Sequence, residues 1–258
     1  MCLSLVDILV MDTSYALRRR FGYLLFAIGF FVGVWLLGGI AWANLEASLF
    51  GVGDVGKNLS GLRCSLLVTS DEMARAQVAL ENPLDRTIDR FVRWRIAQRH
   101  VLMVEQQRDT VTLKPGERKT LERNVSTASG VYGGRFLMVD AFVGSTYPLP
   151  AMEGACGVWV VSIPWLSGLQ VLILGNLVAL LGMGLGLLLV RRYSAGPEGV
   201  SGGAFALLLL SYVVGFGATL LFRWWVIGGV AILLMLLLMV LWLLYRIDRD
   251  WLRVKPPL

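Results

Sequence analysis

Charge and histidine are scarce in this 258-residue chain. Asp, Glu, Lys and Arg make up 16% of it and histidine occurs once, whereas soluble globular domains carry about 25% charged residues. Cysteine occurs three times, and no His or Cys pair has the spacing of metal ligands. Hydrophobic residues instead reach 56%, with a mean hydropathy of +0.67. This balance excludes an ordinary cytosolic protein, a disordered chain and a coiled coil, and it predicts no metal site.

Long uncharged apolar runs are the dominant pattern. A helix needs about 20 such residues to cross the hydrocarbon core of a bilayer. Only Arg223 separates the last two runs, which predicts a tight helical hairpin. The sequence therefore predicts an integral membrane protein with four transmembrane helices, at residues 21–43, 165–190, 203–222 and 224–245.

Basic residues gather on one side of these runs. Arg18, Arg19 and Arg20 precede the first run, and Arg191 and Arg192 follow the second. Because Lys and Arg accumulate in cytoplasmic segments, we expect both termini to lie in the cytoplasm. We expect a multi-pass protein of the inner (cell) membrane, whose helices contact lipid. The expected cytoplasmic segments are 1–20, 191–202 and 246–258, and the expected extracytoplasmic segment is 44–164.

The N-terminal end leaves two alternatives open. The three arginines, the apolar run and the Ala41-Trp42-Ala43 sequence also resemble a signal peptide cleaved after Ala43. The run is longer than the usual 7 to about 15 residues, which favours an uncleaved anchor. Translation starts at either Met1 or Met11.

The expected outer segment has a different pattern, with short alternating stretches between turn signals. Its spacing predicts an all-β antiparallel sandwich inserted between the first two transmembrane helices. The expected strands are 62–69, 74–80, 88–97, 101–106, 110–113, 119–125, 135–143 and 157–163.

Two turns carry a resemblance to a known class of domain. An Asn82-Pro83 turn is followed by a Leu113-Lys114-Pro115-Gly116-Glu117 turn between edge strands. In this respect the segment resembles the immunoglobulin-like (Ig-like) sandwiches of bacterial surfaces, of the fibronectin-III and CARDB types. The resemblance covers about 40% of the chain. It implies a domain that binds, spaces or docks, although a fold does not by itself give a function.

The cysteines divide by compartment. Cys64 lies in the first expected strand and Cys156 just before the last, whereas Cys2 lies on the reducing cytoplasmic side. A Cys64–Cys156 bond would close a loop of about 92 residues and stabilise the sandwich by about 4–5 kcal/mol. The alternative is a pair of buried free thiols.

The densest basic stretch contains Arg93, Arg95 and Arg99. It is a candidate docking site for lipid headgroups, an anionic glycan or an acidic partner surface. The alternative is a solvated strand face, because Val92, Trp94 and Ile96 alternate with these arginines and suit the core.

No pattern predicts catalysis, a cofactor or nucleic-acid binding. His100 is the only imidazole, and the Gly182-Met183-Gly184-Leu185-Gly186 sequence lies in an apolar helix with no strand before it. Small and amide residues in the spans instead predict close helix packing, within one chain or in a homo-oligomer. These are Gly29, Gly33, Gly175, Asn176, Gly182 and Gly186.

Three functional hypotheses follow. The favoured one is a non-catalytic accessory or scaffold subunit whose sandwich docks another membrane or extracytoplasmic protein. The second rests on a resemblance in layout to the permeases of cell-division and lipoprotein-export ABC transporters, although the short 191–202 loop shows no coupling helix. The third is an adhesion or ligand-binding protein, with exposed turn residues such as Tyr132, Arg135 and Tyr147.

Overall fold

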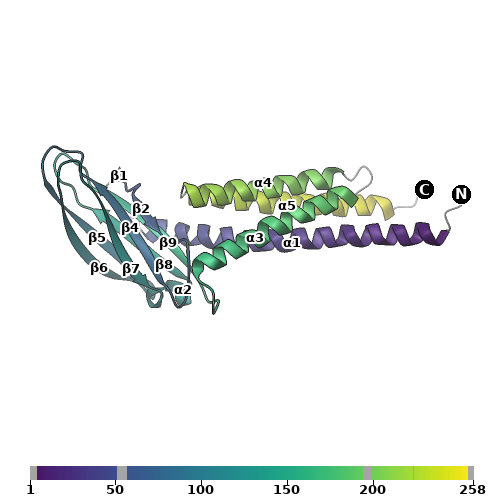
Figure 1. Ribbon diagram of the computed structural model, residues 1–258, viewed down its shortest axis with the longest axis horizontal. Helices are drawn as coiled ribbons and strands as arrows, with labels where there is room; N and C mark the ends of the chain where they lie inside the picture. Colours follow the sequence, from purple (N-terminus) through teal and green to yellow (C-terminus); the bar gives the residue numbers. More distant parts are fainter. Residues whose placement is uncertain (1–4, 51–56, 194–198, 223, 255–258) are drawn as a thin grey trace. The chain divides into compact units, whose positions relative to one another are not determined.

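The computed structural model describes residues 5–50, 57–193, 199–222 and 224–254 (Figure 1). The chain divides into two compact units. The sandwich unit comprises Gly39–Leu172, and the helical unit comprises Met1–Gly38 with Ile173–Leu258. The expectations that concern Met1, Cys2, Arg223 and residues 255–258 lie outside the described residues.

Four helices are long and apolar enough to cross a membrane, as the sequence predicts. In chain order, all strands follow the first of these helices and precede the second. The last residues of the first helix, 39–50, and the first residues of the second, 168–172, belong to the sandwich unit. The four helices are α1 (Leu5–Phe50), α3 (Gly168–Tyr193), α4 (Gly199–Leu221) and α5 (Trp225–Val254).

The helices are longer than the apolar runs. Residues 44–50, expected in the linker to the sandwich, continue α1, and residues 246–254 of the expected tail continue α5. The expected 191–202 loop also shrinks, because α4 begins at Gly199. An apolar run marks the hydrophobic part of a helix, whereas the helix itself continues until its backbone hydrogen bonding stops.

Two sheets face each other across one core. Strands of both sheets contribute its buried aliphatic side chains, with the fully buried Trp94 among them. The six-stranded sheet has the order β1 (Lys57–Asn58), β9 (Met152–Val161), β8 (Phe136–Val143), β5 (Ile88–Gln98), β6 (His100–Leu113), with β3 (Leu67–Thr69) also pairing with β9. The three-stranded sheet has the order β2 (Leu62–Cys64), β4 (Met73–Glu81), β7 (Arg118–Ser126).

The expectation of a purely antiparallel sandwich is wrong for the first strand. The expected strand 62–69 splits into β2 and β3, and β1 and β3 both run parallel to β9. The chain passes from one sheet to the other between β2 and β3. The Ser65 N–H donates to Arg75 O of the three-stranded sheet, while Leu66 O accepts from the Trp159 N–H of the six-stranded sheet. The segment 62–69 therefore contributes to both sheets, because β2 pairs antiparallel with β4 and β3 pairs parallel with β9.

The two strands expected at 101–106 and 110–113 form one strand, β6. The polar residues between them continue the alternation, since Gln107 lies opposite Trp94 and Asp109 opposite Val92. Asp109 also accepts hydrogen bonds from the Trp94 indole at 2.9 Å and from Arg123 of the facing sheet at 2.8 Å. The polar stretch therefore ties the edges of the two sheets together and is not a turn.

The predicted disulfide is present. Cys64 of β2 and Cys156 of β9 are bonded, with their Cα atoms 6.2 Å apart. Because β2 and β9 belong to different sheets, the bond is a covalent link across the core. The alternation predicted for β5 is also present, with Val92, Trp94 and Ile96 all buried.

Candidate functional site

The outer face of the six-stranded sheet carries most of the charged residues that the sequence analysis singled out. Antiparallel pairing places directly opposed residues on the same face. Arg93 therefore lies beside Arg108 of β6 and Phe142 of β8, and Arg95 lies beside Gln106 and Asp140. These side chains form the outer face, because the residues between them on β5 fill the core.

The end of α1 covers one part of this face. A Cβ at Gly157 would lie 1.9 Å from Ala43 O, and one at Gly39 would lie 2.4 Å from the Trp159 ring. The Gly157 N–H also donates to the Asn44 side-chain oxygen at 3.3 Å. The missing side chains at both glycines let the helix and the sheet approach to backbone contact. This helix end is thus part of the packing of the sandwich unit.

Arg95 is already engaged within the chain. Its guanidinium lies 3.5 Å from the Asp140 carboxylate, 4.0 Å from that of Glu153 and 5.6 Å from the centre of the Phe50 ring. Burial and, to a smaller extent, Glu153 raise the pKa of Asp140 while Arg95 and Arg93 lower it, and the net pKa is about 6. Arg95 therefore compensates a buried carboxylate on its own sheet.

Arg99 lies apart from the other two arginines. It occupies the tight turn between β5 and β6 with a φ of 56°, and its N–H donates to Ser129 O. The three predicted docking residues thus divide into Arg93 and Arg95 on the sheet face and Arg99 at the hairpin. The structure does not bring them together as one surface.

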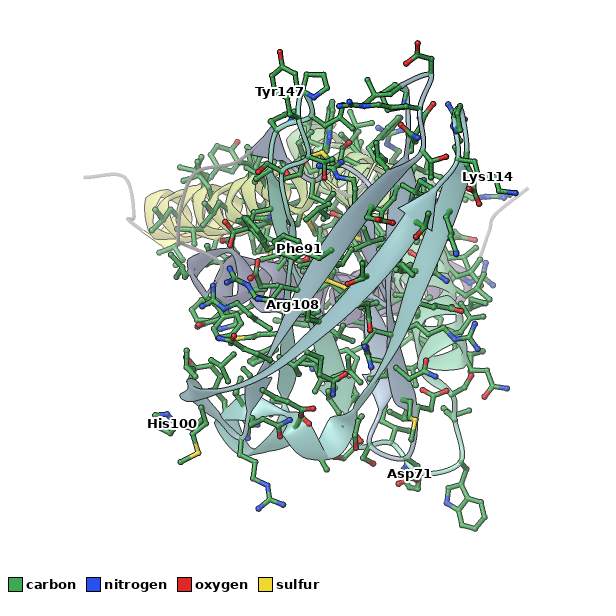
Figure 2. All side chains as sticks on the ribbon, turned by 90° about the vertical axis from the view of Figure 1, so that its left-hand side faces the viewer. Asp71, Phe91, His100, Arg108, Lys114 and Tyr147 are labelled. Atoms are coloured by element: carbon green, nitrogen blue, oxygen red, sulfur yellow. A yellow bond between two sulfur atoms is a disulfide. The ribbon has the colours of Figure 1, made fainter. Side chains whose placement is uncertain are left out.

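Arg108, and not Arg99, lies beside Arg93 on the outer sheet face. Its exposed side chain lies over the Phe91 ring at 5.2 Å, and Arg93 lies over the Phe142 ring at 4.8 Å. Phe91 and Arg108 lie next to each other in Figure 2. Arg108 is absent from the predicted docking residues because residues 107–109 were expected to be a break between two strands. Continued alternation through Gln106, Arg108 and Thr110 was the signal available.

One end of the sandwich unit is built from loops that buried polar residues hold. The fully buried Asn82 side chain donates to the carbonyls of Arg86, Leu113 and Lys114, which joins the two turns of the Ig-like resemblance. The buried Arg90 donates to the carbonyls of Gly144 and Pro150 on the next loop. That loop carries Tyr147, 86% exposed. Figure 2 shows Tyr147 and Lys114 at the end opposite to Asp71 and His100.

Small residues bring the helices of the helical unit together. A Cβ at Gly29 would lie 2.6 Å from Met183 N, and one at Gly186 would lie 2.6 Å from Phe26 N. The Tyr212 hydroxyl donates to the Asn176 side-chain oxygen at 2.9 Å. The remaining predicted packing residues lie in the same kind of contact: Gly182 against Gly29, Gly33 against the Tyr212 ring, and Gly175 against Leu36.

Within the described residues, no group of three His, Cys, Asp or Glu side chains could hold a metal ion. Two hollows in the helical unit are lined mainly by apolar and aromatic side chains, with Arg18 and Arg20 as the charged members. Neither hollow pairs an acid with a base. Among the described residues, the outer sheet face and the loop end are the candidate recognition surfaces.

No known protein family and no curated protein matches the chain. Among solved structures, a β-glucosidase from Erythrobacter marinus matches 38% of this chain and 15% of its own, at 15% identity and a TM-score of 0.27. A β-glucosidase from Listeria innocua matches 40% and 16%, at 14% identity and a TM-score of 0.27. DesR, a β-glucosidase from Streptomyces venezuelae, matches 38% and 15%, at 16% identity and a TM-score of 0.24. The matched part is a small fraction of each enzyme, and similarity at this level carries no argument about activity.

Proposed function

We propose that this chain is a non-catalytic accessory or scaffold subunit of a membrane complex. In this proposal the four apolar helices span the inner (cell) membrane with both termini in the cytoplasm, and the Ig-like sandwich lies outside and docks a partner protein. The disulfide supports an oxidising compartment for the sandwich. The distribution of basic residues supports the orientation.

The observation that carries the proposal is the way the sandwich holds both of its helix ends. The backbone of α1 contacts the sheet at Ala43 and Gly157. At the other connection, the Gly168 N–H donates to the Glu72 carboxylate at 2.7 Å, and the Thr69 N–H donates to the same carboxylate at 2.9 Å. Burial raises the pKa of Glu72, but these hydrogen bonds outweigh it and the net pKa lies below the usual value.

Ordered helix ends within the sandwich unit suit docking, because a segment that is already ordered loses little further freedom when its domain binds a partner. The end of α1 packs against the sheet at Gly157, and Gly168 at the start of α3 is hydrogen-bonded to Glu72. We infer that these ordered segments add little to the entropic cost of binding.

The continuity of α1 favours a second candidate function. One helix runs from Leu5 to Phe50 and contributes residues to both units. A permease-like subunit of an ABC-type transporter would use such a helix to transmit movement driven by a cytoplasmic ATPase. Finding an ATPase among the associated subunits would favour this candidate over a purely structural role.

Site-specific photo-crosslinking in intact cells tests the docking function. A photoreactive residue replaces Tyr147 or Thr110 on the sandwich, and a matched control replaces Leu188 of α3, which is 63% exposed. We expect the sandwich positions to form an adduct of one defined mass with a single protein, and the Leu188 position not to form that adduct. An absence of protein adducts at both sandwich positions would reject docking and favour the adhesion or small-ligand alternative.

A further inference from the structure

We propose that the docking surface is the arginine pair patch, defined as Arg93 and Arg108 with the rings of Phe91 and Phe142. We infer that it binds an acidic polypeptide segment of the partner through side-chain carboxylates. This inference rests on the proposed docking function and specifies its surface and the chemistry of its partner.

Two like charges lie side by side in the patch. Arg93 and Arg108 are directly opposed on β5 and β6. Opposed residues on an antiparallel pair have Cβ atoms about 5 Å apart, and like charges at this distance destabilise the sheet. Neither arginine forms an ion pair in the part of the chain that the structure describes. A bound carboxylate between them would compensate both charges.

Both guanidinium groups are held against aromatic rings. Each lies over a phenylalanine ring, at 4.8 Å for Arg93 on Phe142 and 5.2 Å for Arg108 on Phe91. A guanidinium next to an aromatic ring keeps its N–H groups in its own plane, and a carboxylate accepts two of them when they reach the surface. Arg93 Nε is buried and has no hydrogen-bond partner, so it is a desolvated donor that lacks an acceptor.

Four arginines of the sandwich unit are paired with carboxylates. Arg75 lies 3.7 Å from Glu122, Arg118 lies 3.0 Å from Glu81, and Arg123 lies 2.8 Å from Asp109. Arg95, the neighbour of Arg93 on the same strand, faces two carboxylates. Arg93 and Arg108 differ from these four in forming no ion pair within the described residues, although Arg93 still lowers the pKa of the neighbouring Asp140. They also lie directly opposite each other.

The surroundings of the patch favour a polypeptide over a membrane surface. Anionic lipid surfaces are recognised by clusters of about four to eight basic residues, whereas this patch holds two. Its neighbours on β6 are Gln106 and Thr110, both exposed. They flank Arg108 on the same face and supply neutral hydrogen-bonding groups that suit a peptide backbone.

The test uses the full chain in detergent micelles or nanodiscs, with fluorescent hexaglutamate as the probe and hexaglutamine as its neutral counterpart. We expect hexaglutamate to bind and hexaglutamine not to bind. Arg93→Gln and Arg108→Gln should each weaken hexaglutamate binding about tenfold, because each removes one charge-assisted contact. Arg93→Lys keeps the charge but loses the planar fork, and it should weaken binding less than Arg93→Gln.

The matched control is Arg75→Gln on the three-stranded sheet, which removes the same charge from an arginine that already has a partner. We expect it to leave hexaglutamate binding unchanged. An equal loss in all three glutamine variants, or no binding by the unmodified chain, would overturn the proposed patch. Binding of vesicles rich in phosphatidylglycerol that is lost in Arg93→Gln, without hexaglutamate binding, would assign the patch to lipid and overturn the peptide assignment.

The crosslinked partner described above separates this inference from the function on which it rests. If the adduct persists unchanged in the Arg93→Gln and Arg108→Gln variants, docking stands and the patch is rejected. If hexaglutamate binds as expected but no protein adduct forms in cells, the docking function is rejected.

Discussion

The two units of this chain hold together by different means. In the helical unit, large apolar side chains such as Leu188 and Leu233 point outward, 63% and 68% exposed, and glycines form the closest contacts inside. In the sandwich unit, the aliphatic side chains lie inside with a disulfide and buried polar residues such as Asn82. Lipid removes most of the advantage of burying apolar surface, so helices in a membrane rely on close packing and hydrogen bonds instead. Large apolar side chains therefore face outward in the helical unit and inward in the sandwich unit.

The largest expected effect concerns the disulfide, which should stabilise the sandwich unit alone. The double variant Cys64→Ala/Cys156→Ala should lower the free energy of unfolding of the sandwich by about 4–5 kcal/mol, since the bond closes a long loop. The resistance of residues 57–161 to limited proteolysis in denaturant measures this loss. Cys2→Ala is the control and should change nothing. An equal loss of stability in the helical unit would contradict the expectation that the disulfide stabilises the sandwich unit alone.

The next effect concerns the buried carboxylate of the sandwich. Burial raises the pKa of Asp140 from 3.8 to about 6. Because the folded-state pKa lies above that of the unfolded chain, the contribution of this group to stability is complete below about pH 4 and is lost as the pH rises through about 6. The unmodified chain should lose about 3 kcal/mol relative to Asp140→Asn across this window.

Thermal unfolding of both chains between pH 4 and pH 7 measures that difference. Asp85→Asn, which neutralises an exposed turn carboxylate, is the matched control and should run parallel to the unmodified chain. Parallel curves for the unmodified chain and Asp140→Asn would show that Arg95 compensates the buried charge fully.

A smaller effect on stability is expected from alanine substitutions, and it should differ between two glycines of α1. A Cβ at Gly29 would lie 2.6 Å from the Met183 backbone nitrogen, whereas a Cβ at Gly38 would meet nothing within 4 Å. Gly29→Ala should therefore destabilise the helical unit by about 2 kcal/mol through overpacking against backbone. Gly38→Ala should leave it unchanged or stabilise it by a fraction of 1 kcal/mol, because alanine favours the helix by about that much. Steric trapping in bilayers compares the two, and equal effects would contradict backbone contact at Gly29.

The smallest effect concerns the hydrogen bond between Tyr212 and Asn176. Hydrogen bonds between membrane helices contribute about 0.6 kcal/mol on average and rarely more than about 1.7. Tyr212→Phe should destabilise the helical unit by an amount in this range. A double-mutant cycle with Asn176→Leu measures the coupling between the two residues, and zero coupling would assign their contribution to shape alone.

The features that the sequence predicted depend on local regularity. The alternation in β5 places Val92, Trp94 and Ile96 inside because a strand has a period of two, and the paired positions of Cys64 and Cys156 follow from the first and last strands. The four apolar helices follow from length alone. Each of these inferences needs only residues that are close in sequence or a simple chain order.

The features that the sequence did not reveal depend on distant contacts. Two such contacts are the pairing of β3 with β9 and the close approach of Ala43 to Gly157. Each joins residues about 90 or more positions apart, and no local pattern encodes them. The same holds for Arg95, whose basic character suggested a free surface until Asp140 of β8 proved to face it. Arg108 was overlooked because its polar neighbours resemble a turn until β6 is paired with β5.

The most direct test of the proposed function is the intact mass of the assembly after gentle extraction of native membranes. We expect a discrete complex in which this 28.5 kDa chain is accompanied by at least one different protein in fixed stoichiometry. A lone monomer, or an oligomer built from this chain alone, would contradict the role as an accessory subunit.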